Sequence, residues 1–168
     1  CITGDSVKAG DQKDAKAVHE FESVRLLQQI RAFNKGIDPT LGELSDKKTS
    51  IFPGTAADPS CRNKRSLKNR IIRKKEAGAQ FIQTQMIMEK ENLIEFCEEI
   101  SKPLEIPVIA GVFLLKSYKN ALFINKYVPG ANIPEKILNR LKDAKDPLQE
   151  GIQIAAEQAQ DFINIANG

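Results

Sequence analysis

The 168-residue sequence predicts an α/β fold, in which short strands alternate with longer helices on a parallel sheet. Two observations predict it. Apolar runs of four or five residues, such as Pro107–Gly111, are separated by longer stretches with helical spacing of apolar side chains. Segments with polar, acidic or glycine residues also lie near the ends of the short runs, at Thr3–Asp5, Ala56–Asp58, Gln83–Gln85 and Gly111. Such placement is typical of a (βα)8 barrel, whose active groups lie at the carboxyl ends of its strands.

Each predicted helix carries an apolar stripe formed by side chains three and four residues apart. The predicted helices cover residues 23–36, 66–77, 89–101, 117–128 and 147–166, with a further helix that begins near residue 134. Ser23 and Ser117 are suited to cap helices, because a serine oxygen accepts a free backbone N–H. Gly36 and Gly78 are suited to end them. Pro134 fits a first helical turn.

The predicted strands are short apolar runs at residues 50–52, 81–84 and 107–111, after a first strand already under way at Cys1. Val108–Ala110 is the continuous apolar run expected of a buried parallel strand. No GxGxxG or GxxxxGK[ST] motif follows a strand, so a dinucleotide-binding fold or a P-loop has no support. A barrel therefore remains the expected architecture.

The predicted barrel is incomplete. A full (βα)8 barrel takes about 250 residues, whereas this chain supplies only four or five strands. A partial barrel standing alone would leave two sheet edges open. We therefore expect residues 1–168 to be a single domain that forms the C-terminal portion of a longer barrel protein.

Composition sets limits on location and partners. The chain is 41% apolar and 28% charged, which is typical of a globular protein. No apolar run approaches the roughly 18 residues needed to cross a bilayer, and no signal peptide is apparent, so we expect no membrane association. Three widely spaced cysteines fit neither a disulfide framework nor a metal site. These features favour a cytoplasmic protein without a bound metal.

One stretch, Arg62–Lys75, holds eight basic residues in fourteen and no acidic residue. A surface that binds nucleic acid would be expected to offer aromatic side chains for base stacking, and this stretch has none. We therefore expect no nucleic-acid partner. A solvated helix face and a local site for a phosphate or diphosphate both remain open.

Five blocks resemble the methylenetetrahydrofolate reductase family: CITGD with GDQKDAKAV, KKEAGAQFIQTQ, IPVIAGVFLLKSYKNA, VPGANIPEKILNRLKDA and EGIQIAAE. They stand in the order of the family and cover nearly the whole chain. The resemblance implies a flavin-dependent TIM barrel, of which this chain covers about strands 4 to 7 with their helices. It also implies reduction of 5,10-methylenetetrahydrofolate to 5-methyltetrahydrofolate, with FAD as cofactor and NADH or NADPH as donor, in one-carbon metabolism.

The resemblance also implies a cofactor site. Asp5 matches a catalytic aspartate beside the flavin pyrimidine edge, and Thr3 and Gly4 match neighbouring contacts; without the resemblance, Asp5 would be read as a helix cap or turn residue. Lys74 matches a lysine near the FAD diphosphate, with a surface lysine as the alternative. Ala57 and Asp58 match cofactor contacts; Asp58 meets either a ribose hydroxyl or the backbone of a turn.

For the substrate, Gln85 matches a glutamine that binds the pterin ring, and Asn120 a folate-contacting amide. Gln83 is expected on the opposite side of the strand. Leu114 and Ile124 depart from the family pattern, which puts folate specificity in doubt. Ile124 stands where some members have an aromatic on the substrate.

The general acid of the family, a glutamate on the first strand, is not in this chain, so we do not expect these residues alone to turn over. An alternative function is therefore a non-catalytic or partner-dependent flavoprotein subunit of the same fold. Either function implies a homo-oligomer or a complex with another subunit. A phosphate-binding lyase that uses Lys74 or Lys116 is a more distant alternative.

Overall fold

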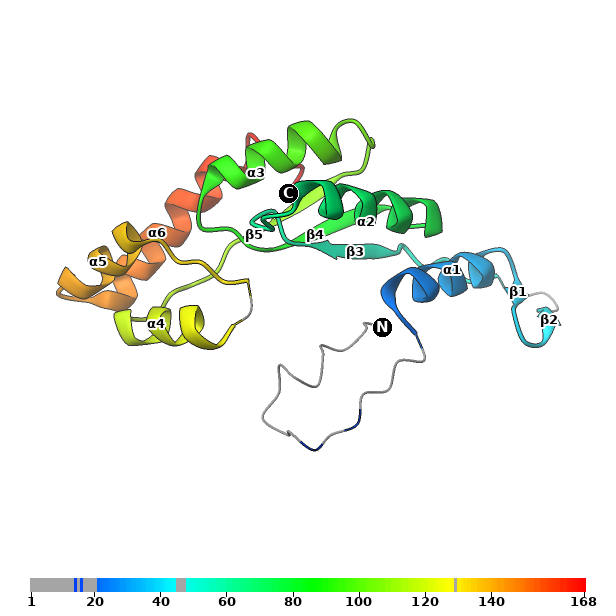
Figure 1. Cartoon of the computed structure of the whole chain (residues 1–168), viewed down its shortest axis with the longest axis horizontal. Helices are drawn as coiled ribbons and strands as arrows, with labels where there is room; N and C mark the ends of the chain where they lie inside the picture. The colour runs from blue at the N-terminus through cyan, green and yellow to red at the C-terminus, as the bar shows by residue number, and fades with distance from the viewer. Residues whose placement is uncertain (1–13, 15, 17–20, 45–47, 129) are drawn as a thin grey trace.

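The computed structural model describes residues 14, 16, 21–44, 48–128 and 130–168, and all structural statements concern these residues. Thr3, Gly4 and Asp5 lie outside them, as does the first predicted strand. The centre is a parallel sheet of β3 (Gly54–Ala57), β4 (Phe81–Met86) and β5 (Val108–Gly111), in the order β3-β4-β5 (Figure 1). The predicted α/β class with a parallel sheet is therefore confirmed.

Helices follow each strand of this sheet. The helices are α1 (Ser23–Asn34), α2 (Lys64–Ala77), α3 (Lys90–Phe96), α4 (Tyr118–Tyr127), α5 (Glu135–Asp143) and α6 (Pro147–Phe162). A π-helical segment, Cys97–Ser101, continues α3, and a small antiparallel pair, β1 (Ile37–Asp38) and β2 (Gly42–Glu43), follows α1. No helix in the described ranges is both long enough and apolar enough to cross a bilayer.

Local signals fix several helix ends. The Ser117 hydroxyl accepts the Asn120 N–H at 3.1 Å, so the predicted cap of α4 is confirmed. Gly78 follows α2 with φ at 122°, a conformation that favours glycine. The start of α1 was predicted one residue late, because Glu22 occupies the capping position and Ser23 is already helical. The start of α2 was also late, because the Asn63 side chain caps it by accepting the Ser66 N–H.

The sheet has one covered face and one open face. Thr55, Ile82 and Val108 lie side by side across the three strands, and all three are buried. Under them pack α2, α3 and the end of α6, through the apolar residues Leu67, Ile71, Leu93, Phe96 and Phe162. On the other face, the row formed by Ala56, Gln83 and Ile109 is exposed in the described part of the chain.

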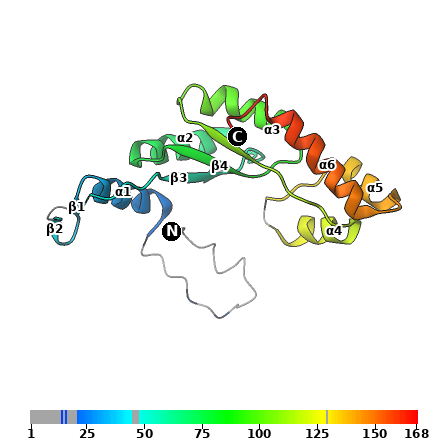
Figure 2. The same cartoon turned by 180° about the vertical axis from the view of Figure 1, so that it is seen from behind.

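A second apolar core holds α4, α5 and α6 together, and it contains Leu115, Ala121, Ile124, Ile137, Leu141 and Ile154. These three helices gather at one end of the molecule, while α1 and the β1–β2 pair lie at the other (Figures 1 and 2). The chain then returns to the sheet: the Asn167 N–H donates to the Val108 carbonyl at 3.0 Å, and the Ala110 N–H donates to the Gly168 carbonyl at 2.7 Å. The C-terminus therefore lies along β5.

The strand predicted at residues 50–52 is wrong. Ile51 and Phe52 are 45% and 66% exposed, and the strand begins instead at Gly54. The Asn34 side chain donates to the Ile51 carbonyl at 2.8 Å and accepts the Ile51 N–H at 3.0 Å. A neighbouring strand would need those same backbone groups, and Pro53 has no N–H to offer. The asparagine of α1 therefore keeps this segment out of the sheet.

Candidate functional site

All described residues of the candidate site except Asn120 meet at the carboxyl edge of the parallel sheet. Ala57 ends β3 and pairs in register with Thr84, so Asp58 and Gln85 follow at the same edge. A cavity of about 210 Å³ opens there, lined by Ala56, Ala57, Asp58, Leu67, Arg70, Ile71, Lys74 and Gln85. It brings together four residues that the sequence singled out: Ala57, Asp58, Lys74 and Gln85.

Lys74 projects from the last turn of α2 toward the end of β3. Its Nζ donates to the Ala56 carbonyl at 2.9 Å. Burial lowers the pKa of the Lys74 ammonium, and the positive charge of Arg70 lowers it further. Arg70 stands four residues earlier, on the same face of α2, and lines the same cavity. The sequence analysis missed Arg70, although its spacing from Lys74 in the basic helix is the signal that identifies it.

The two carboxylate oxygens of Asp58 have different surroundings. One carboxylate oxygen, Oδ1, accepts the Ser60 N–H at 2.9 Å, so its predicted role in holding a turn is confirmed. The other, Oδ2, faces the connection between α4 and α5, where a Cβ built on Gly130 would lie 3.2 Å from it. Gly130 has φ at 82°. Asp58 therefore lies where the α4–α5 connection approaches the end of β3.

Gln83 was predicted on the opposite side of the strand from Gln85, and this is wrong. Both glutamines are exposed, and they alternate with the buried Ile82 and Thr84. Side chains two residues apart on a strand point to the same face. The open face of the sheet therefore presents two amides in line, and only Gln85 reaches the cavity.

Thr84 joins β4 to β5 beside this cavity. Its hydroxyl donates to the Gln85 carbonyl at 2.8 Å and accepts the Gly111 N–H at 2.8 Å. A Cβ on Gly111 would lie 2.7 Å from the Gln85 carbonyl oxygen, so the close approach of the two strands requires glycine. The Thr84 side chain therefore joins the ends of the two strands through backbone groups.

Asn120 lies in the first turn of α4 and is not among the residues that line the cavity. Its side-chain oxygen accepts the Lys116 N–H at 3.2 Å. In this structure its carbonyl therefore holds the turn that enters α4, and its NH₂ group is left for other contacts.

A larger cavity of about 740 Å³ adjoins the first and runs between α1 and β3. The two cavities share Ala56 and Lys74. Apolar side chains of α1, including Leu26, Leu27 and Ile30, line the larger one. The Thr55 hydroxyl is buried and has no hydrogen-bond partner in the described part of the chain. Lys74 is thus a cation at the junction of a polar and an apolar cavity.

Fold and site together define an α/β protein whose parallel sheet ends in a cleft lined by two cations, a carboxylate and an amide. The family model described as methylenetetrahydrofolate reductase matches residues 1–167. The chain therefore belongs to the methylenetetrahydrofolate reductase family, which confirms the resemblance read from the sequence and places the chain in a family of folate-related oxidoreductases. A comparison with curated proteins found no match.

Proposed function

We propose that this chain forms part of a flavin-dependent (βα)8 barrel that reduces 5,10-methylenetetrahydrofolate to 5-methyltetrahydrofolate, with NADH or NADPH as the donor. Family membership supports the proposal. The observation that carries it to particular residues is the single cavity that Asp58, Lys74 and Gln85 share at the carboxyl edge of the sheet. Active groups of such barrels lie at that edge.

The chemistry of the cavity fits FAD. Lys74 uses one N–H on the Ala56 carbonyl and keeps two for phosphate oxygens. Arg70 adds a second positive charge on the same wall, and a diphosphate would offset the unfavourable burial of the Lys74 charge. When bound, FAD supplies the hydride chemistry that side chains lack. Asp58 Oδ2 would accept from a ribose hydroxyl, and Ala57 would contribute its backbone.

On the substrate side, we assign Gln85 to the pterin ring. An exposed amide offers a donor and an acceptor together, which matches the polar edge of a pterin. Asn120 would contact the folate through its NH₂ group, because its carbonyl already accepts the Lys116 N–H. Asp5, with Thr3 and Gly4, stays assigned to the flavin pyrimidine edge, where its carboxylate would favour positive charge on the folate.

We interpret the described three-stranded sheet as a portion of the barrel wall, within a single domain over residues 1–168 that covers about strands 4 to 7. The covered face, with its buried row of Thr55, Ile82 and Val108, suits the helix side of such a wall. The exposed row on the other face suits the barrel interior, which other strands would line. The Asn167 N–H donates to β5 and the Gly168 carbonyl accepts from it, so residues 167 and 168 lie along the edge of β5 that β4 does not occupy.

A second candidate function is a partner-dependent flavoprotein subunit of the same fold. One observation favours it. Ile124, at a position where some family members place an aromatic on the substrate, is only 4% exposed and packs into the core of α4, α5 and α6. A folate would therefore gain no contact from it. In that case the flavin site would serve another subunit, and no folate would be reduced without it.

The experiment is a visible spectrum of the intact purified protein under anaerobic conditions. The proposed enzyme would show bound flavin, lose its colour with NADH or NADPH, and recover it with methylenetetrahydrofolate. Bleaching without recovery would favour the subunit function. A colourless protein that takes up no added FAD would overturn the assignments of Asp5 and Lys74.

A further inference from the structure

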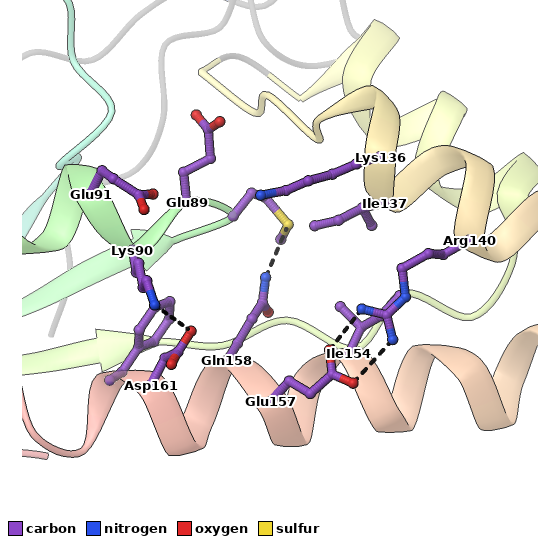
Figure 3. Close-up of a pocket in the computed structure, with 12 residues that line it drawn as sticks. Glu89, Lys90, Glu91, Lys136, Ile137, Arg140, Ile154, Glu157, Gln158 and Asp161 are labelled. Carbon is purple, nitrogen blue, oxygen red and sulfur yellow. Dashed lines mark hydrogen bonds and ion pairs between the residues drawn. The ribbon is translucent and has the colours of Figure 1, made fainter.

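A cavity of about 380 Å³ lies away from the sheet edge, between the turn after β4, helix α5 and helix α6 (Figure 3). It shares no lining residue with the two cavities described above. Its volume falls at the lower end of the range of small-molecule sites, about 300–1,000 Å³. Apolar side chains form part of its lining: Met88, Ile137, Ile154 and Phe162. The cavity therefore has the size and part of the lining of a ligand site.

Gln158 of α6 is the unusual residue of this lining. It is only 9% exposed, and its Oε1 is buried with no hydrogen-bond partner in the described part of the chain. Its Nε2 donates only to the Met88 sulfur, at 3.8 Å. Buried amide oxygens nearly always have a partner. Because the terminal amide torsion is soft and the bond to sulfur is weak, a donor in the cavity can draw Oε1 toward itself.

Charged side chains of both signs line the cavity. Glu89 and Glu91 lie at the start of α3, where the cation of Lys90 is paired with Asp161. Lys136 and Arg140 come from α5, and the Lys136 side chain extends across the cavity above the Gln158 amide (Figure 3). Arg140 is already paired, with Glu150 and Glu157. In the described part of the chain, Glu89, Glu91 and Lys136 have no ion-pair partner. The unpaired charges of the cavity are thus two carboxylates and one ammonium, over a lining that is partly apolar.

We propose that this cavity binds a small zwitterion, namely an α-amino acid with an apolar side chain. Its ammonium group donates to Gln158 Oε1 on the side of Glu89, and its carboxylate meets Lys136. The side chain packs against Ile137, Ile154 and Phe162. A dipolar ligand meets the unpaired charges of both signs and the unpartnered amide acceptor at once, whereas a simple anion or cation meets charges of one sign only.

The test is calorimetric titration of the intact protein with L-leucine, isoamylamine and isocaproate. Isoamylamine lacks the carboxylate of leucine, and isocaproate lacks its ammonium. We expect leucine to bind. Each analogue should bind more weakly by at least about tenfold, because each lacks one hydrogen-bonded charge of leucine. No heat with leucine, as for a cavity filled by water only, would overturn the proposal, and so would equal binding of all three compounds.

Two variants connect binding to the residues. Gln158→Leu removes the amide and Lys136→Gln the exposed cation, and each should weaken leucine binding about tenfold or more. Gln160→Leu, at an exposed position on the same helix, is the matched control and should bind like the parent. Unchanged binding in both site variants would refute the assignment. The titration needs neither flavin nor folate, so its outcome is independent of the reductase proposal.

Discussion

Replacement of Gly151 by alanine tests the packing of α6 against the segment that follows β5. Gly151 is buried within α6, and a Cβ built there would lie 1.8 Å from the Leu115 carbonyl oxygen. Two effects oppose each other. Alanine is favoured over glycine inside a helix by about 1 kcal/mol, but overpacking a well-packed site costs about 1–3 kcal/mol and occasionally more.

The steric effect should win. Ordinary contacts of a Cβ begin at 3.4 Å, so the helix or the Leu115 backbone would have to move well over an ångström, and Leu115 is itself only 1% exposed in the second core. We expect Gly151→Ala to lower the free energy of unfolding by about 2 kcal/mol net. For a chain of this length that corresponds to a fall in Tm of roughly 4–8 °C.

The assay is thermal unfolding followed by circular dichroism, with denaturant unfolding as a second measure. The matched variant is Ala156→Gly, at an exposed position of the same helix, which should cost only the helix-propensity difference of about 1 kcal/mol. A Gly151→Ala protein with an unchanged or higher Tm would refute the reasoning, because helix propensity would then be the larger effect and α6 would not approach Leu115 so closely.

Three further changes probe the site and its supports. Lys74→Met should weaken FAD binding about tenfold or more, through loss of a charged hydrogen bond, while Lys68→Met on the exposed face of the same helix should not; flavin fluorescence titration compares them. Thr84→Val should cost about 1–3 kcal/mol in denaturant unfolding, because it leaves the Gly111 N–H without an acceptor, and Thr84→Ser should restore most of it. Hydrogen bonds from its arginine partner hold the pKa of Glu157 below its usual range. The stabilising contribution of Glu157 is therefore present above the pKa of an unfolded glutamate and is lost as the pH falls through the lowered pKa of the folded state. Over that pH range, the Tm of Glu157→Gln should fall less than the Tm of the parent.

The sequence predicted the local structure well where local chemistry decides it. Apolar spacing located every helix that follows a strand, and the cap at Ser117 and the glycine at position 78 fell where predicted. Those features depend on residues within one or two turns of each other. The strand before Ala57 was placed too early in the sequence, but Ala57, Asp58 and Gln85 were expected at one edge of the sheet and are found there.

Errors arose where distant residues compete for the same groups. Residues 50–52 have the composition of a strand, but Asn34, seventeen positions away, takes the Ile51 backbone groups. The error at Gln83 has a different cause. Alternation of side chains along a strand places Gln83 and Gln85 on the same face, and the sequence analysis did not apply this rule to Gln83. The π-helical segment after α3 had no signal that we recognised.

By itself, the sequence determined the α/β class, the family and most of the candidate residues, because apolar periodicity, capping residues and the ordered motif blocks are all properties of the chain as written. Only the tertiary structure decided which side chains share a cavity. It placed Arg70 beside Lys74 in one cavity, and it engaged the Asn120 side chain with the Lys116 N–H at the start of α4. It also enclosed Gln158 in a cavity between the start of α3, α5 and α6. The physical reason is that a cavity is defined by the packing of segments far apart in the chain, and neither spacing nor composition records how closely those segments approach.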